Sequence, residues 1–322
     1  MRLLCILLIL NIIFADYGGG YAGSGFRYGS NARKFSLAGA LVADKTPGFY
    51  AFSNPALLQF SIHNHIGMSF QNMPLDRSIQ SFSYTRRLPP SAGVGLAVFR
   101  AGTKNIVGRD TMNKETEIFS SSEIEGIISF GVALGSKLAL GINIKAFSTF
   151  FNDLEDIDAS GTGIAGDIGF IYKFNRRLLL GGVIKNLNAK YNWKVIIGEE
   201  NRSYVEKFPQ NYIIGIAYLG LKGTSLFFQE DIMILPNDNV NYRTRIGSEF
   251  RFANKIKLRG GIKQLLGALP AGAIMGMNIK PTIGVGVPIQ VWQKQYIHLD
   301  YALDLGRVGE GLSHLFSFSM EF

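Results

Sequence analysis

The sequence predicts an all-β protein: a transmembrane, antiparallel, up-and-down β-barrel of about fourteen strands with an N-terminal plug. Hydrophobic residues make up 47% of the 322-residue chain, yet after residue 15 no apolar run reaches the ~18 residues of a spanning helix. From about His65 onward, apolar and polar residues alternate with a period of two, which is typical of strands with one apolar face. Short and long connections between these segments alternate, as in outer-membrane barrels.

The first residues have the pattern of a secretory signal peptide. A positive start, Met1-Arg2, precedes the apolar run Leu3–Phe14, which is too short to span a membrane. Ala15 provides a small residue for cleavage. We therefore expect residues 1–15 to be a signal peptide and the protein to be exported. Cleavage would remove the only cysteine, Cys5, so the mature chain would have no disulfides.

The mature chain divides into a plug over residues 16–62 and a barrel over residues 63–322. Tyr17–Gly29 is rich in glycine and predicts a loop, and Asn31–Asp44 has room for a short helix. Strand-like alternation begins only after these segments. The N-terminal part is therefore not expected to form part of the barrel wall.

Period-two alternation is clearest at Lys137–Lys145, where four aliphatic side chains fall on one face and small or polar ones on the other. About fourteen segments share the pattern, starting near residues 64, 78, 92, 123, 137, 162, 177, 210, 223, 242, 255, 281, 294 and 312. Long connections are expected at Ala101–Ser122, Phe151–Gly161, Asn188–Pro209 and Lys263–Lys280.

Alternation by itself fits two kinds of barrel. In a soluble barrel the apolar face points inward, whereas in an outer-membrane barrel it meets lipid and the polar face lines the lumen. The number of strands and the rhythm of the connections favour the membrane barrel. Phe322, the last residue of the last alternating segment, fits the C-terminal aromatic assembly signal of such barrels.

The segment Gly29–Leu58 resembles the N-terminal plug region of FadL-like and PorV/PorQ-like outer-membrane proteins. The family pattern is an Arg, a small-residue cluster, Val-Ala, and Asn-Pro-Ala followed by Leu. It is met here by Arg33, Ala38-Gly39-Ala40, Val42-Ala43-Asp44, Asn54-Pro55-Ala56 and Leu57 or Leu58. Gly166–Asn188 and Leu299–Phe322 also look like the family. Phe52-Ser53 departs from the aromatic–Trp pair expected before Asn-Pro, and the chain is shorter than typical fatty-acid channels.

The resemblance implies a fourteen-stranded barrel in the outer membrane of a Gram-negative-type bacterium, with its lumen closed by an N-terminal hatch. It implies passive transport of hydrophobic, fatty-acid-like small molecules or, alternatively, a PorV/PorQ-type role in type IX protein secretion. The expected partners are outer-membrane lipids, the barrel-assembly machinery, and either a hydrophobic small-molecule substrate or secretion-system proteins.

Two groups of residues are candidate sites. Asn54, Pro55 and Ala56 would gate the lumen, or would simply form a turn into the first strand. Polar-face charges would line the lumen, either as an anion-attracting, substrate-orienting path or as an internal salt-bridge network. The candidates are Lys145, Asp167, Lys185, Arg243, Arg245, Glu249, Arg251, Lys257, Arg259, His298 and Asp300. Glu230, Asp231 and Asp44 are candidate partners for the arginines.

Other classes of function find little support in the sequence. There is no GxSxG or HExxH motif, and His63 and His65 lack an evident third ligand, so we expect no enzyme, no metal and no cofactor. The net charge of +9 is dispersed along the chain rather than gathered in a basic run, so we expect no nucleic-acid partner.

Overall fold

The computed structural model describes residues 20–46, 48–152, 157–221, 223–252, 256–264, 279–292, 295–305 and 311–322. The expected signal peptide, residues 1–15, lies outside these ranges. Over the described residues, sixteen strands join in one antiparallel sheet. They are β1 His65–Met73, β2 Arg77–Leu88, β3 Ala92–Arg109, β4 Glu115–Leu134, β5 Leu138–Asn152, β6 Ile157–Lys173, β7 Leu178–Leu187, β8 Lys190–Ile197, β9 Glu200–Lys207, β10 Gln210–Leu221, β11 Thr224–Ile234, β12 Val240–Phe252, β13 Ile256–Gln264, β14 Ile279–Trp292, β15 Gln295–Asp304 and β16 Ser313–Glu321.

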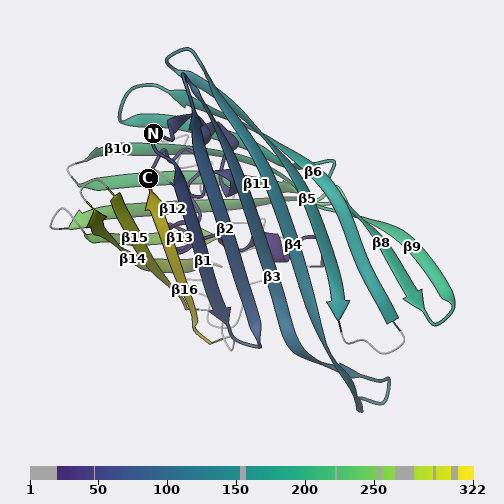
Figure 1. Ribbon diagram of the computed structural model, residues 1–322. Helices are drawn as coiled ribbons and strands as arrows, with labels where there is room; N and C mark the ends of the chain where they lie inside the picture. The colour runs from purple at the N-terminus through teal and green to yellow at the C-terminus, as the bar shows by residue number, and fades with distance from the viewer. Residues whose placement is uncertain are drawn as a thin grey trace.

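Fourteen of these strands close into a barrel, as predicted (Figure 1). β1 to β7 and β10 to β16 pair in sequence order, and β16 returns to pair with β1. The seam is continued by the last residue, because the backbone N–H and C=O of Phe322 both bond to Asn64 at 3.0 Å. The remaining strands, β8 and β9, form a hairpin that pairs with β6 beyond the point where β7 ends.

The barrel has its apolar side chains on the outside. On β5, the side chains of Leu140, Ile142 and Ile144 are 40%, 47% and 63% exposed, whereas Asn143 and Lys145 are buried. The same alternation of exposed aliphatic or aromatic residues with buried small or polar ones recurs on β1, β3 and β16. A soluble barrel would be unstable with this outer surface in water, so the pattern is that of a barrel surrounded by lipid.

Three of the four predictions of a long loop are wrong. β3 continues to Arg109 and β4 starts at Glu115, so most of Ala101–Ser122 is strand. Phe151–Gly161 and Asn188–Pro209 are likewise largely strand, the second holding the whole β8–β9 hairpin. Backbone pairing between strands continues beyond the residues in which apolar and polar side chains alternate. Strands that project beyond a membrane need no apolar face, so their sequences lose the alternation. The fourth long loop, Lys263–Lys280, lies mostly outside the described residues.

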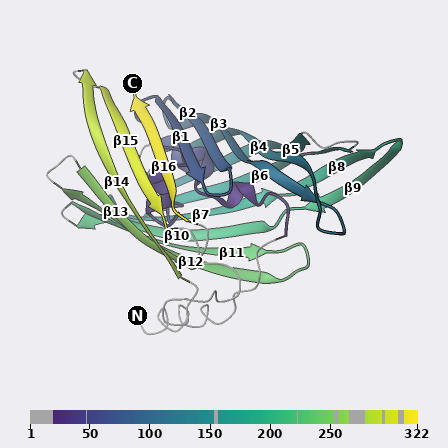
Figure 2. The same ribbon diagram turned by 90° about the horizontal axis from the view of Figure 1, so that it is seen from below.

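The prolonged strands give the barrel one tall side. Figure 2 shows β8 and β9 extending well past β10 to β16, and β4, β5 and β6 are 20, 15 and 17 residues long. We call the end formed by the turns 110–114 and 198–199 the tall rim. The wall bends where β7 passes into β8, and there Asn186 and Asn188 take positive φ angles of 64° and 54°. Asparagine tolerates this left-handed backbone better than most residues.

The first described residues, 20–46 and 48–62, lie inside the barrel (Figure 1), and we call them the N-terminal segment. It holds three short 3₁₀ helices, η1 Gly25–Arg27, η2 Tyr50–Phe52 and η3 Pro55–Phe60, and the α-helix α2 Ala32–Ser36. Asn31 caps α2 by accepting a hydrogen bond from the Lys34 N–H, consistent with the expected helix within Asn31–Asp44. In the described part of the chain, no helix is both long and apolar enough to span a membrane.

Candidate functional site

Asn54 fixes the N-terminal segment to the barrel wall. Its side chain is fully buried, and its Nδ2 donates to the carbonyl oxygens of Val42, Phe170 and Gly182 at 3.0, 3.0 and 3.2 Å. Its Oδ1 accepts a hydrogen bond from the Ala56 N–H and so caps η3. Pro55 occupies the first position of η3, where a backbone N–H would have no partner within the helix. The amide therefore joins two parts of the N-terminal segment to β6 and β7.

Glycines on the inner wall make room for this contact. A Cβ atom on Gly131, Gly141 or Gly169 would come closer than 3.0 Å to the backbone of Pro55 or to the side chain of Asn54. Across the lumen, Gly247 and Gly261 face Leu37 and Ala38 equally closely. Glycine thus marks where the wall touches the N-terminal segment, on both sides of the lumen.

Charged groups predicted from the sequence form a chain of ion pairs at one wall. Glu249 accepts hydrogen bonds from Arg33 at 3.0 Å and from Arg259 at 2.7 Å, and Arg259 also pairs with Asp300. Arg33, which lies on α2, pairs in addition with Asp44. The network therefore ties the N-terminal segment to β12, β13 and β15, and buried charges of this kind require such partners.

A second group of ion pairs lies at the opposite wall. Lys145 contacts Glu125 at 3.2 Å and Asp167 at 3.1 Å, and all three side chains are nearly inaccessible. On the side of the first network, Arg245 of β12 pairs with Asp231 of the neighbouring strand β11. The structure thus brings Lys145 and Asp167 together, and it brings Arg245 to one of its candidate partners.

The other predicted charges are placed differently. Lys185 donates to the carbonyl oxygen of Phe52 at 2.6 Å, and Arg243 lines the lumenal cavity described below. His298 is half-buried, 3.8 Å from Glu321, and Lys257 is half-buried at the wall. Arg251 is exposed near the end of β12. Among the residues that the structure describes, no three His, Cys, Asp or Glu side chains gather in a way that could hold a metal.

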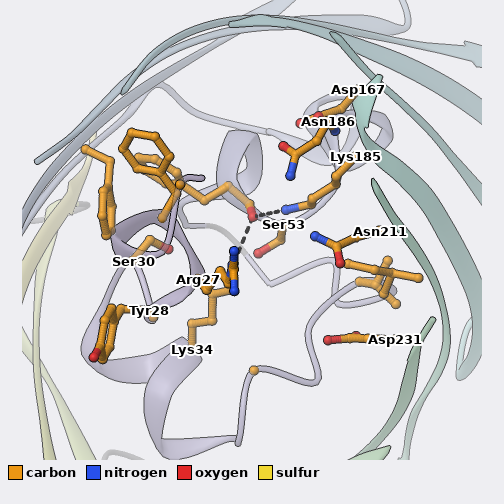
Figure 3. A pocket seen from close by; sticks show the side chains of 18 of the residues that line it. Arg27, Tyr28, Ser30, Lys34, Ser53, Asp167, Lys185, Asn186, Asn211 and Asp231 are labelled. Carbon is orange, nitrogen blue, oxygen red and sulfur yellow. Dashed lines mark hydrogen bonds between the residues drawn. The ribbon is translucent and has the colours of Figure 1, made fainter. Parts of the chain in front are cut away.

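A cavity of about 140 Å³ lies inside the barrel beside the N-terminal segment (Figure 3). Its lining includes charged groups from β4, β5, β6, β7, β11, β12 and β13 and aromatic rings from β3 and the N-terminal segment. Lys34 and Lys185 approach it from opposite sides, Lys34 from α2 and Lys185 from β7. At this cavity, predicted lumenal charges such as Lys145, Lys185 and Arg245 meet residues of the N-terminal segment.

Aromatic rings continue from this cavity toward the tall rim. Phe26, on η1, lies 6.1 Å from Phe99, 6.4 Å from Phe147 and 6.4 Å from Phe208, measured between ring centroids. Phe147 and Phe208 in turn contact Tyr191 of β8 at 5.3 and 4.8 Å. A cluster of buried, mutually packed aromatic rings therefore extends from the β8 strand to the cavity.

No known protein-family profile and no curated protein matches the sequence. Solved structures do match the fold. The toluene transporter TbuX of Ralstonia pickettii aligns with a TM-score of 0.66 at 14% identity, over 93% of this chain and 99% of its own. The CymD monoaromatic hydrocarbon channel aligns at 0.64 and 14%, over 91% and 98%. A Pseudomonas aeruginosa FadL homologue aligns at 0.63 and 11%, over 93% and 99%.

The chain shares its fold with these proteins. The structural alignments extend over almost the whole length of both chains, and so they cover most of the barrel. The resemblance to FadL-like proteins is thus confirmed at the level of fold. At this identity the likeness carries no individual residue from one protein to another.

Several residues at the cavity are absent from the sequence-derived candidates. Lys34 and Phe26 lie in the N-terminal segment, where no period-two pattern assigns a side chain to the lumen. Glu125 lies on the same β4 face as Ile127 and Ser129, so its parity places it on the inner wall and could have identified it.

Proposed function

We propose that this protein is an outer-membrane channel through which hydrophobic small molecules pass passively. The exposed apolar band of the barrel supports a place in a membrane, and among bacterial membranes the outer one holds closed barrels of this type. The described functions of the matching structures, transport of toluene and conduction of monoaromatic hydrocarbons, support the class of substrate.

The observation that carries the proposal is the aromatic route inside the barrel. The rings of Tyr191, Phe147, Phe208 and Phe26 pack together between the β8 strand and the cavity, and in this proposal an apolar molecule passes from the tall rim by displacing them. A hydrophilic pore would expose polar groups along its mouth, whereas these rings offer apolar contact at each step. In this proposal the tall rim is extracellular and the short turns face the periplasm.

The N-terminal segment is the proposed gate. Asn54, Pro55 and Ala56 hold it against β5 and β6, and Arg33 holds it against β12 and β13. Because it contacts opposite walls, its displacement would open a path past the cavity. Deleting residues 29–58 and measuring conductance in a planar bilayer tests this role: a large rise supports the gate, and an unchanged conductance would remove it.

The function itself is tested by uptake of radiolabelled toluene into a Gram-negative host with an intact lipopolysaccharide leaflet. Cells carrying the protein should accumulate toluene faster than cells with an empty vector, and a protonophore should leave the initial rate unchanged, since the transport is passive. Equal rates with and without the folded barrel would refute the proposal.

A second candidate, a component of type IX secretion, is favoured by one feature only. Among the described strands β9 pairs with β8 alone, so its other edge presents free backbone groups at the tall rim. Such an edge can take up a strand from a protein partner. Removing residues 190–207 in the native host should then impair secretion of cargo proteins. Normal secretion by this variant would exclude the secretion role and leave the channel as the proposed function.

A further inference from the structure

The lumenal cavity carries an excess of positive charge. Seven basic side chains and three carboxylates line it. The three carboxylates are already engaged: Glu125 and Asp167 contact Lys145, and Asp231 contacts Arg245. Basic groups that line the cavity therefore outnumber the carboxylates that line it, and a buried charge is costly unless it is paired.

Two of these cations converge on one neutral atom. The Nζ atoms of Lys34 and Lys185 donate to the same acceptor, the carbonyl oxygen of Phe52, at 2.8 and 2.6 Å (Figure 3). Neither ammonium has a carboxylate within 4.0 Å among the described residues. Burial, reinforced by the positive charges of Lys185 and Arg245, holds the pKa of Lys34 well below its usual value. An anion at this point would satisfy both ammonium groups.

Part of the cavity lining is aromatic. The side chains of Phe26, Phe52, Phe99 and Phe208 all contribute to its lining. The Phe52 and Phe99 rings meet edge to face at 6.1 Å. The volume, about 140 Å³, is close to that of an engineered apolar cavity of ~150 Å³ that binds benzene in another protein. The cavity therefore joins a ring-sized apolar space to a pair of unneutralised ammonium groups.

We propose that this cavity binds small aromatic carboxylates, with the ring against Phe52 and Phe99 and the carboxylate between Lys34 and Lys185. This inference rests on the proposed function and names the substrate class of its lumenal site. A carboxylate would receive a charge-assisted hydrogen bond from each ammonium, stronger than the bonds to the Phe52 carbonyl that it replaces. The two ammonium groups of Lys34 and Lys185, which lie on either side of the Phe52 carbonyl oxygen, would then share one counterion.

Calorimetric titration of the purified, detergent-solubilised full chain with benzoate tests the proposal. Benzoate should bind, and Lys34→Gln and Lys185→Gln should each weaken its binding by about tenfold or more. Lys137→Gln is the matched control, because Lys137 is exposed in the turn between β4 and β5 and should leave binding unchanged. Heat-modifiable migration in electrophoresis verifies that each barrel is folded, and two independent lysines keep the test usable if one variant fails to fold.

Titrations with hexanoate and chloride, and toluene uptake by cells, complete the design. If hexanoate and chloride bind more weakly than benzoate, the result supports an aromatic carboxylate as the ligand. Hexanoate binding as tight as that of benzoate would overturn the assignment to an aromatic ring. Chloride that competes with benzoate at equal concentration would overturn the assignment to a carboxylate. No benzoate binding to the folded wild type, with toluene uptake by cells intact, would refute this inference and leave the proposed channel standing. Loss of toluene uptake itself would refute the channel instead.

Discussion

Replacing Gly261 by valine would push a side chain into the N-terminal segment. Gly261 lies on β13 with its Cβ direction toward α2, and an added Cβ would lie 2.8 Å from the Ala38 nitrogen and 2.9 Å from the Leu37 carbonyl carbon. Ordinary contact begins near 3.4 Å, so the backbone of the segment would have to retreat by about 0.5 Å. The two γ-methyl groups of valine increase the required movement.

The size of the effect follows from known costs of overpacking. Inserting carbon atoms into a packed interior typically costs ~1–3 kcal/mol. At about 2 kcal/mol, the equilibrium between docked and undocked segment shifts by roughly 30-fold. Trypsin can cut after Lys34 only when the segment undocks, because this side chain is buried against Phe52. The rate of cleavage in detergent should therefore rise by about 30-fold, since it follows the undocked population.

The neighbouring residue provides the control. Gly260 lies on the same strand but on the opposite face, and its added Cβ would be 3.9 Å from its nearest neighbour, the Thr282 carbonyl oxygen. Gly260→Val should leave cleavage after Lys34 close to the wild-type rate. Equal rates for Gly261→Val and Gly260→Val would show that the contact between β13 and the N-terminal segment does not hold the segment in place.

Three further changes have defined outcomes. Asn54→Ala leaves three buried carbonyl oxygens with one donor fewer, so it should destabilise docking of the segment by ~1–3 kcal/mol and raise conductance in planar bilayers; wild-type conductance would contradict the anchoring role. Arg33→Gln leaves Asp44 without its cation and Glu249 with one fewer, and should lower the free energy of unfolding in urea by ~3–5 kcal/mol, whereas the exposed Arg202→Gln should change it little. Phe322→Ser should reduce the amount of barrel assembled in the outer membrane of cells, as measured by fractionation, and normal assembly would exclude the C-terminal signal.

The barrel could be predicted because its wall obeys a simple rule. Strands such as β5 place an aliphatic side chain on every second residue, and this regularity gives the element type, the number of strands in the barrel and both faces. Which face points outward followed from the number of strands and their connections. The exposed Ile144 beside the buried Lys145 shows the result in two consecutive residues.

The tall rim and the lumen were harder to predict for physical reasons. Beyond the membrane, strands need no apolar face, so β9 carries polar residues on both sides and resembles a loop in the sequence. The neighbouring β8 is short, although its Tyr191, Trp193 and Val195 alternate with polar residues. The lumenal pairings join residues far apart in the chain, such as Arg33 with Glu249. Periodicity places Glu249 on the inner wall but says nothing about how an irregular N-terminal segment folds against it.

The central claim is that apolar molecules occupy the aromatic cavity inside the barrel. Anomalous diffraction from crystals equilibrated with bromobenzene locates the bromine directly. We expect bromine density inside the lumen, bounded by Phe26, Phe52, Phe99 and Phe208. Bromine found only on the outer apolar band, with the lumenal cavity filled by water, would contradict it.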